Sequence, residues 1–508
     1  MKKIYRNIIF NYLGLIWSKL LNLILLPVIV IGLGNDAYGL FSIIFVIIGY
    51  YSILDLGIGS AVIKYVAQYN AESKKEDINT LISVSFQAFT FLGLGASVSV
   101  FLFAGKFVSI IQIPSNLVHT AKIVLYITII QFSLNLIFSV FSSVLVGMQR
   151  LDTLNKIGIF TNTLGISTMA ILAKLGYGLI PIVSLNLCYS ILNIFLTVYY
   201  ATKYLTSFKL NLISFYPIQL RKIISFSLFA FIIQAGYLIH TTTDRLLIGV
   251  FCPVAFVTFY MVGMKLSEIL RFLPSPLARV LLPIVSELGA KKNFVRIEEL
   301  YIRGTKYILI LILPISIILF VFSFDLLKLW MGESYALHSS FVLKLLTVGV
   351  AANMYGFISY IVLMGLARHR IIAIYSLAAA LINIALDLFL IPKYGINGAA
   401  FASALAFGVT YIPMVSHSMW ILKIRIESFL KEIGQPLFWG IIFTGVVLAV
   451  KFFVKPKGWF QLITVGIAGL AVYYWFNWIG GGIKARDREL LGDLYKEAIS
   501  GFSRRISQ

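Results

Sequence analysis

Seven ionisable side chains fall inside long apolar stretches of this sequence. They are four bases and three acids: Lys19, Arg245, Lys265, Arg271, Asp55, Asp244 and Glu268. An ionisable group at membrane depth costs roughly 2.5–3.5 kcal/mol, so such groups normally face a polar cavity. Because the bases outnumber the acids, the set favours a cavity that binds an anionic ligand. The acids would balance charge or bind a coupling ion.

The spacing of three of these residues is informative. Lys265, Glu268 and Arg271 recur every three residues, which places Glu268 within reach of both bases on one helix face. Glu268 would then either neutralise its neighbours or act as a proton or cation site that changes partner during a conformational cycle.

Charges near predicted helix ends have a second interpretation. Asp244 and Arg245 would only orient a helix end if they extend to the membrane interface. Asp387 also lies within two turns of a predicted helix end, and we expect it to extend to the interface in the same way.

The composition indicates that these residues sit in a membrane body. The chain has 508 residues, of which 60% are hydrophobic and 12% charged, and its mean hydropathy is +0.94. Soluble domains are about 45–50% apolar and about 25% charged. The net charge of +22 would suggest nucleic-acid binding in a soluble protein, but here Lys and Arg lie mainly in short loops. We therefore expect no nucleic-acid partner.

Long apolar runs set the expected fold. A membrane-spanning helix needs about 20 such residues, and this criterion predicts about fourteen helices. The predicted helices lie near 8–33, 38–62, 81–111, 118–146, 157–174, 178–201, 223–250, 254–285, 307–331, 338–366, 371–391, 396–421, 436–453 and 459–481. Because the runs are long and continuously apolar, they predict an all-α polytopic fold rather than a membrane barrel.

The loops predict an orientation. Lys and Arg concentrate in alternate loops, which places both termini in the cytoplasm by the positive-inside rule. The basic N-terminus precedes an apolar run too long for a signal peptide and without a cleavage site, so we expect a retained first helix. Residues 482–508 predict either an amphipathic helix on the anionic inner leaflet or a solvated tail without a role.

An internal repeat divides the chain. Segment 145–150 (LVGMQR) matches 363–368 (LMGLAR) at an offset of 218 residues, and Lys174 recurs as Lys393 at an offset of 219. The offset spans six helices, so both halves enter the membrane in the same sense, as in transporters that rock two halves around a cavity. The predicted divisions are 1–210 and 211–430 for the six-helix halves, 431–481 for helices 13 and 14, and 482–508 for the tail.

The sequence lacks the motifs of several kinds of catalytic and metal chemistry. It contains no phosphate-binding G-x-x-x-x-G-K-[ST] motif and no H-E-x-x-H, and its five histidines lack metal-ligand spacing. The carboxylates are too dispersed for a catalytic pair. We therefore expect no enzymatic activity, no cofactor and no metal centre.

Four segments resemble a known family. They are DLGIGSAVIKYVAQY at 55–69, TDRLLIG at 243–249, residues 260–288 with LLP at 281–283, and KYGINGAA at 393–400. Together they resemble the polysaccharide-export branch of the multidrug/oligosaccharidyl-lipid/polysaccharide exporter superfamily. The resemblance covers nearly the whole chain and is more specific for the branch than for the substrate.

The resemblance implies a function. Members of this branch flip undecaprenyl-diphosphate-linked oligosaccharides (O-antigen, capsule or exopolysaccharide units) from the inner to the outer leaflet of the bacterial plasma membrane. Helices 1, 2, 7 and 8 would line the cavity, and its bases would meet the diphosphate, which Arg binds with two parallel hydrogen bonds. The implied partners are the lipid-linked oligosaccharide, membrane lipids, and polysaccharide polymerase and chain-length proteins.

Three alternatives remain open at the level of sequence. A drug or cation antiporter of the same superfamily would need a carboxylate-rich site, whereas bases predominate here. A lipid II flippase would follow the same charge logic. A polysaccharide polymerase usually carries one long outer loop, and the longest predicted loops here are on the inner side.

Overall fold

The computed structural model describes residues 2–205, 208–211, 217–454, 456, 458–480 and 482, with the side chains of 2–13, 15, 217–230, 276 and 279 left aside. The predicted tail, 482–508, lies almost entirely outside the described residues. The described chain is α-helical and contains no strand. This confirms the all-α class, in which every helix satisfies its own backbone hydrogen bonds.

Two compact units make up the chain. Unit 1 comprises Met1–Lys265 and Ser376–Ser403, and unit 2 comprises Leu266–Tyr375 and Ala404–Gln508. The boundaries of these units differ from those of the predicted repeat. Unit 1 includes part of the predicted second half, since those residues pack with it. The division into two sequence halves stays a prediction.

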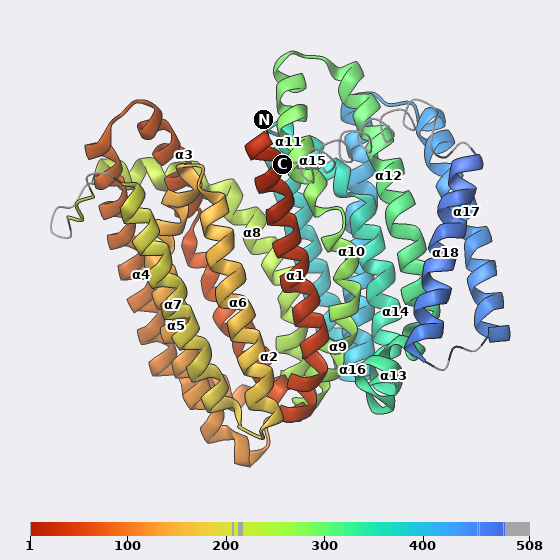
Figure 1. The fold of residues 1–508 in the computed structure, drawn as a ribbon, viewed down its shortest axis with the longest axis horizontal. Coiled ribbons are helices and arrows are strands. Elements are labelled where there is room, and N and C mark those ends of the chain that lie inside the picture. The colour runs from red at the N-terminus through yellow and green to blue at the C-terminus, as the bar shows by residue number, and fades with distance from the viewer. Residues whose placement is uncertain are drawn as a thin grey trace, which may run out of the picture. The chain divides into compact units, whose positions relative to one another are not determined.

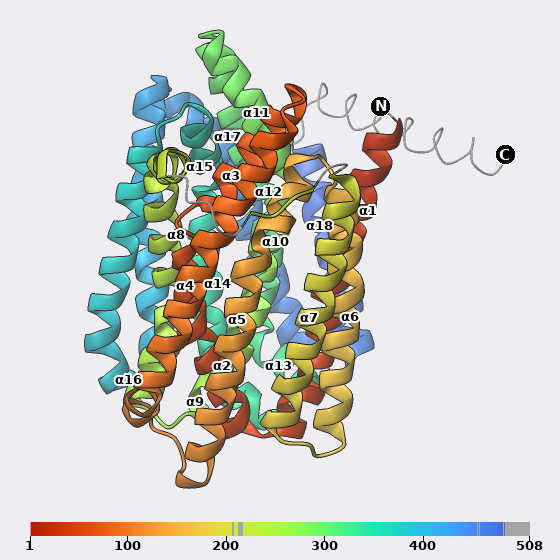
Figure 2. The ribbon, with the colours of Figure 1, turned by 90° about the vertical axis from the view of Figure 1, so that its left-hand side faces the viewer.

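Unit 1 is a bundle of long helices. Its elements are α1 (Lys2–Leu33), α2 (Asn35–Tyr50), η1 (Tyr51–Asp55), α3 (Ile58–Ala71), α4 (Lys75–Ile110), η2 (Ser115–Leu117), α5 (Val118–Gly147), α6 (Leu151–Lys174), α7 (Leu179–Tyr204), α8 (Pro217–Phe251) and most of α9 (Ala255–Ser267). α1 runs alongside α6 (Figure 1), and α4, α5, α7 and α6 lie side by side in the view of Figure 2.

The predicted second helix is broken. α2 ends at Tyr50, a short 3-10 turn follows, and Leu56 and Gly57 both take positive φ values of 47° and 75° before α3 begins. The carboxylate of Asp55 accepts a hydrogen bond of 3.2 Å from the amide of Gly59, in the first turn of α3. The break frees backbone amides, and Asp55 satisfies one of them.

Unit 2 begins within the predicted eighth helix, which is also segmented. Its elements are α10 (Ile269–Phe272), α11 (Ser275–Ala290), α12 (Phe294–Val321), α13 (Ser323–Met331), α14 (Glu333–Tyr355), α15 (Phe357–Gly365), the two ends of α16 (His369–Leu422), α17 (Ile426–Val454) and α18 (Trp459–Ile479). The chain leaves the α10 helix at Pro274, as expected where proline removes a backbone donor.

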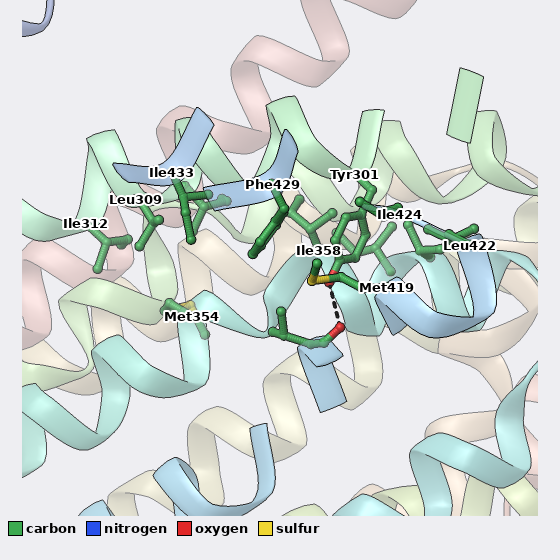
Figure 3. Close-up of a cluster of buried hydrophobic side chains, with 14 of the residues drawn as sticks. Tyr301, Leu309, Ile312, Met354, Ile358, Met419, Leu422, Ile424, Phe429 and Ile433 are labelled. Atoms are coloured by element: carbon green, nitrogen blue, oxygen red, sulfur yellow. Dashed lines mark hydrogen bonds between the residues drawn. The ribbon is translucent and has the colours of Figure 1, made fainter. Parts of the chain in front are cut away.

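Each unit has its own apolar core. In unit 1, α3, α4 and α5 enclose Val62, Phe89 and Val144. In unit 2, α12, α15 and the start of α17 enclose Tyr301, Ile358 and Phe429 (Figure 3). Tyr301 is fully buried, and its hydroxyl is hydrogen-bonded to Ser359 at 2.9 Å and donates to the carbonyl of Val415 at 3.1 Å.

Eleven helices of the described residues are long and apolar enough to cross a membrane, by length and composition. One of them, α16, contains two of the predicted spans. The predicted spans that are not among the eleven are those over α8 and over the α9–α11 series. The chain is thus a multi-pass membrane protein in which all fourteen predicted segments are helical.

Candidate functional site

A cluster of buried polar side chains lies inside unit 1. α8 contributes His240 and Asp244, α9 contributes Tyr260, and α16 contributes Asn383, Asp387 and Ser403, and the exposed fraction of each is between 0% and 4%. We call these six residues the Asp244–Asp387 cluster. Buried polar groups in apolar surroundings are costly unless they serve a purpose, so their convergence marks a candidate site.

A sharp turn in α16 brings its two parts to this cluster. The helix is interrupted at Gly395, whose φ of 57° and ψ of −137° are accessible to glycine and strained for other residues. Asn383 and Asp387 are one turn apart before this interruption, and Ser403 lies after it. The chain therefore folds back, and Ser403 reaches the carboxylate of Asp244 on α8.

Two hydroxyl groups converge on one oxygen of Asp244. Tyr260 and Ser403 both donate to Oδ2 of this carboxylate, the latter over 2.6 Å. The carboxyl group of Asp387 lies against that of Asp244 from the other helix. These two hydroxyl donors hold the orientation of the Asp244 carboxylate.

Several polar atoms of the cluster lack a hydrogen-bond partner among the described residues. Among the described residues, no hydrogen bond reaches Oδ1 of Asp244, either carboxyl oxygen of Asp387, or the side-chain amide of Asn383. No described Lys or Arg forms an ion pair with either carboxyl group. Two adjacent buried carboxylates cannot both remain charged without a cation, so the pair must hold a proton or a small positive ion.

The expectation that Asp387 extends to the membrane interface is wrong. Its side chain has an exposed fraction of 0% and contacts Asp244 instead of solvent. The error has a physical cause, because the helix that follows Gly395 folds back and covers the end of the predicted span. The signal for this role was Asn383, which places a second polar group one turn away on the same face.

Arg245 is next to Asp244 in sequence but turns away from it. Its guanidinium donates to the carbonyl of Thr241 on its own helix over 3.4 Å, and its Nε is buried without a partner among the described residues. Arg245 therefore makes none of the contacts that hold Asp244 in the cluster.

Lys19 lies on α1 with an exposed side chain. Two residues earlier, the indole of Trp17 donates to the hydroxyl of Thr163 over 3.0 Å and fixes α1 against α6. Residues two apart are about 200° apart around a helix. Lys19 therefore projects away from α6.

The remaining predicted residues fall in both units. Lys265 is a half-buried residue of α9 at the end of unit 1. Glu268 immediately precedes α10 in unit 2, and its carbonyl accepts from the amides of Arg271 and Phe272. Arg271 stacks over the ring of Phe407 at 4.7 Å, with its Nε buried and without a partner among the described residues. The stacking fixes the plane of the guanidinium.

Asp55 has a structural explanation of its own. Its carboxylate binds the first turn of α3, as an N-terminal capping residue does.

No group of three or more His, Cys, Asp or Glu residues suited to a metal occurs in the described part of the chain. The Asp244–Asp387 cluster, with two carboxylates, suits a proton or a monovalent cation.

The sequence is similar to known proteins over much of its length. Residues 33–340 match a family described as polysaccharide biosynthesis protein. A Shigella flexneri protein named for O-antigen transport is 23% identical over 403 residues, covering 78% of this chain and 93% of that protein. This similarity therefore extends over most of both chains.

Solved structures share the architecture. The lipid II flippase MurJ, in an inward closed conformation, matches with a TM-score of 0.73 at 18% identity, over 92% of this chain and 98% of that one. An inward-facing multidrug resistance transporter of the MATE family matches with a TM-score of 0.67 at 14% identity, over 80% and 94%. At these identities, both similarities show the fold alone.

Proposed function

The chain belongs to the polysaccharide biosynthesis protein family, and we propose that it carries a lipid-linked oligosaccharide across the membrane. The observation that carries the proposal is the similarity to the relative named for O-antigen transport, which extends over 93% of that relative. The substrate is an oligosaccharide on undecaprenyl diphosphate. It moves from the inner to the outer leaflet of the bacterial plasma membrane, with both termini of the protein in the cytoplasm.

Alternating access is the mechanism we propose. The two sequence halves rock around a cavity, the sugar and diphosphate cross inside it, and the prenyl tail stays in lipid. Lys19, Arg245, Lys265 and Arg271 bind the diphosphate. The exposure of Lys19 and the fixed guanidinium plane of Arg271 support such contacts with an anion.

The Asp244–Asp387 cluster couples transport to an ion gradient. Its paired carboxylates bind one proton or one monovalent cation, because oxygen ligands without donors suit a hard cation. Asp244 thus takes the coupling role predicted for it. Glu268 balances the charge of its neighbouring bases, and Asp55 acts chiefly on its helix end.

The rival function is export of a cationic drug, which the carboxylate pair and the fold would permit. Burial argues against it, because the exposed fractions of Asp244 and Asp387 are 3% and 0%. Such an enclosed pair fits a small ion rather than an organic cation. A lipid II flippase differs only in the headgroup that the cavity accepts.

Reconstitution tests the function directly. Purified full-length protein in liposomes should move a fluorescent undecaprenyl-diphosphate oligosaccharide to the leaflet where an impermeant quencher reaches it, and ethidium should not be transported. Replacing all four bases with Gln should abolish this movement, while Lys75→Gln, at the exposed start of α4, should not. Movement that survives the fourfold replacement would contradict the proposed cavity. Faster movement of lipid II than of the oligosaccharide would change the substrate.

A further inference from the structure

Uncharged polar side chains follow one face of α7, inside unit 1. Asn186, Ser190 and Asn193 recur at spacings of four and three residues, which places them on one side of the helix. The opposite side of α7 carries large exposed apolar residues, namely Ile191, Phe195 and Tyr199. A membrane helix with two such faces turns the apolar one toward lipid and the polar one toward the protein.

Hydrogen bonds join this polar face to the two neighbouring helices. Near the middle of α5, Gln131 and Asn135 are one turn apart. Nδ2 of Asn135 donates to Oγ of Ser190 over 2.8 Å, and Ser190 donates back to Oδ1 of Asn135 over 3.0 Å. Nδ2 of Asn193 donates to the hydroxyl of Thr161 on α6 over 2.8 Å. The three helices lie side by side in Figure 2. We call the five polar residues of α5 and α7 the polar strip: Gln131, Asn135, Asn186, Ser190 and Asn193.

Part of the polar strip has no partner in the described part of the chain. The side chains of Gln131 and Asn186 make no hydrogen bond there, and Oε1 of Gln131 is buried. Asn186 is turned toward α6, because a Cβ added at Gly165 would lie 3.8 Å from its Oδ1. Amides without partners are costly at membrane depth. The strip therefore has donors and acceptors available for a ligand that can use both.

The polar strip is also electrically neutral. Residues 123–147 of α5, 157–173 of α6 and 179–202 of α7 contain no Asp, Glu, Lys or Arg. The strip thus offers no charge to attract a diphosphate and no carboxylate to hold a cation. A hydroxyl group both donates and accepts hydrogen bonds, as an amide does. The chemistry of the strip therefore fits a neutral ligand that is rich in hydroxyl groups, which is a sugar.

The predicted repeat provides an internal comparison. At its offset of 219 residues, positions 186, 190 and 193 correspond to Leu405, Val409 and Ile412, which are exposed apolar residues of α16. A helix at these positions thus needs no polar side chain in order to form. Because the polarity is confined to the first half, a requirement of the fold does not explain it.

We propose that the polar strip binds the sugar residues of the transported headgroup, while the bases bind its diphosphate. This inference rests on the proposed function for the identity of the cargo. Asn186 and Asn193 are about 10 Å apart along α7, which is enough for contacts with more than one sugar ring. A lipid carrier without sugar leaves these amides unpaired, so the strip favours the loaded carrier over the unloaded one.

The two side chains that make no internal hydrogen bond allow a direct test. The double variant Gln131→Met, Asn186→Leu, purified at full length in detergent, should bind a fluorescent undecaprenyl-diphosphate oligosaccharide about tenfold or more weakly, since it loses two hydrogen bonds. Undecaprenyl diphosphate without sugar, added as a competitor, should bind the variant and the wild type equally. The control is Thr202→Val, because that hydroxyl donates only to carbonyls of α7 itself. It should change neither affinity.

Two further measurements separate binding from folding. The double variant should unfold at the temperature of the wild type, because neither side chain has a partner to lose. In protein with Cys188 and Cys252 replaced by Ser, Asn186→Cys should react with a maleimide. The same oligosaccharide, released from its lipid by mild acid, should protect it from the reagent, and undecaprenyl diphosphate should not.

The outcomes separate the polar strip from the proposed function. Undiminished binding of the oligosaccharide lipid by the double variant, an equal loss for the sugar-free lipid, or no protection of Asn186→Cys by the released sugar would overturn the strip. If the wild type and the double variant move the lipid-linked oligosaccharide equally well, transport stands and the strip is wrong. If the released oligosaccharide protects Asn186→Cys but the wild type moves no lipid-linked form, the strip stands and the proposed transport is wrong.

Discussion

At the scale of single residues, the hydroxyl groups around Asp244 should tune ion binding. A hydrogen bond to a charged group is worth about 1.5–3 kcal/mol, so Tyr260→Phe should weaken binding of the coupling ion about tenfold or more. Tyr301→Phe is the matched control, because it also removes a buried tyrosine hydroxyl but lies in the apolar core of unit 2. Transport against increasing sodium concentration or a pH gradient measures the change, and an equal shift in both variants would contradict it.

The carboxylates themselves give a sharper test. Asp387→Asn and Asp244→Asn keep the shape of the cluster but remove the charges that retain an ion, so gradient-driven transport should be lost while the protein reaches the membrane normally. Asp77→Asn, on the exposed first turn of α4, should have no effect. Sodium and proton gradients imposed separately identify the ion. Full transport by both cluster variants would exclude the cluster from coupling.

Which parts of the site could be predicted differs from residue to residue. Asp244 stands out in sequence because an acid in an apolar helix is costly. The burial of Asp387 cannot be predicted in this way, since it depends on the turn at Gly395. Tyr260 and Ser403 carried no signal, because single hydroxyl groups are common in membrane helices and gain a role only through the carboxylate they meet.

At the scale of elements, the break after α2 makes a prediction about Asp55. If its carboxylate serves the first turn of α3, Asp55→Asn should retain transport, since Asn caps helices as well as Asp does. Asp55→Ala should reduce the free energy of unfolding by about 1 kcal/mol. Thermal unfolding and transport assays together measure both effects. Loss of transport in a stable Asp55→Asn variant would instead assign Asp55 the predicted coupling role.

Helix α17 is attached to α12 of the same unit by a buried ion pair. Lys306, with an exposed fraction of 2%, contacts Glu432 over 2.9 Å. Because Lys306→Met removes a charge-assisted contact from Glu432, it should destabilise the protein by about 1.5–3 kcal/mol. Lys451→Met breaks a more exposed pair with Asp325 and should cost about 1 kcal/mol.

A double replacement separates the contribution of the ion pair to stability from that of the Lys306 side chain itself. Lys306→Met combined with Glu432→Met should recover part of the lost stability, since the carboxylate that loses its lysine contact is removed as well. Thermal unfolding in detergent provides the measurement. If the double variant is as unstable as Lys306→Met, then packing of the lysine stem matters more than its charge.

At the scale of the whole molecule, composition and periodicity predict the fold class. They do not predict where helices break or how the chain divides into two packed units. Apolar runs locate the helices because a span of fixed length must exclude water from its backbone. They do not locate the breaks at Gly57 and Pro274, since a short interruption barely changes the hydropathy of a run. Nor do they reveal that residues 376–403 pack with unit 1, because packing depends on contacts between distant segments.

The orientation of the whole chain follows from its loops and can be tested with two cysteines. Basic residues on alternate loops predict that the turn after α6 is outer and the turn before α4 is inner. With Cys188 and Cys252 replaced by Ser, Tyr177→Cys should react with an impermeant maleimide in intact cells. Ser73→Cys should react only after permeabilisation. The reverse pattern would contradict the predicted orientation, in which both termini lie in the cytoplasm.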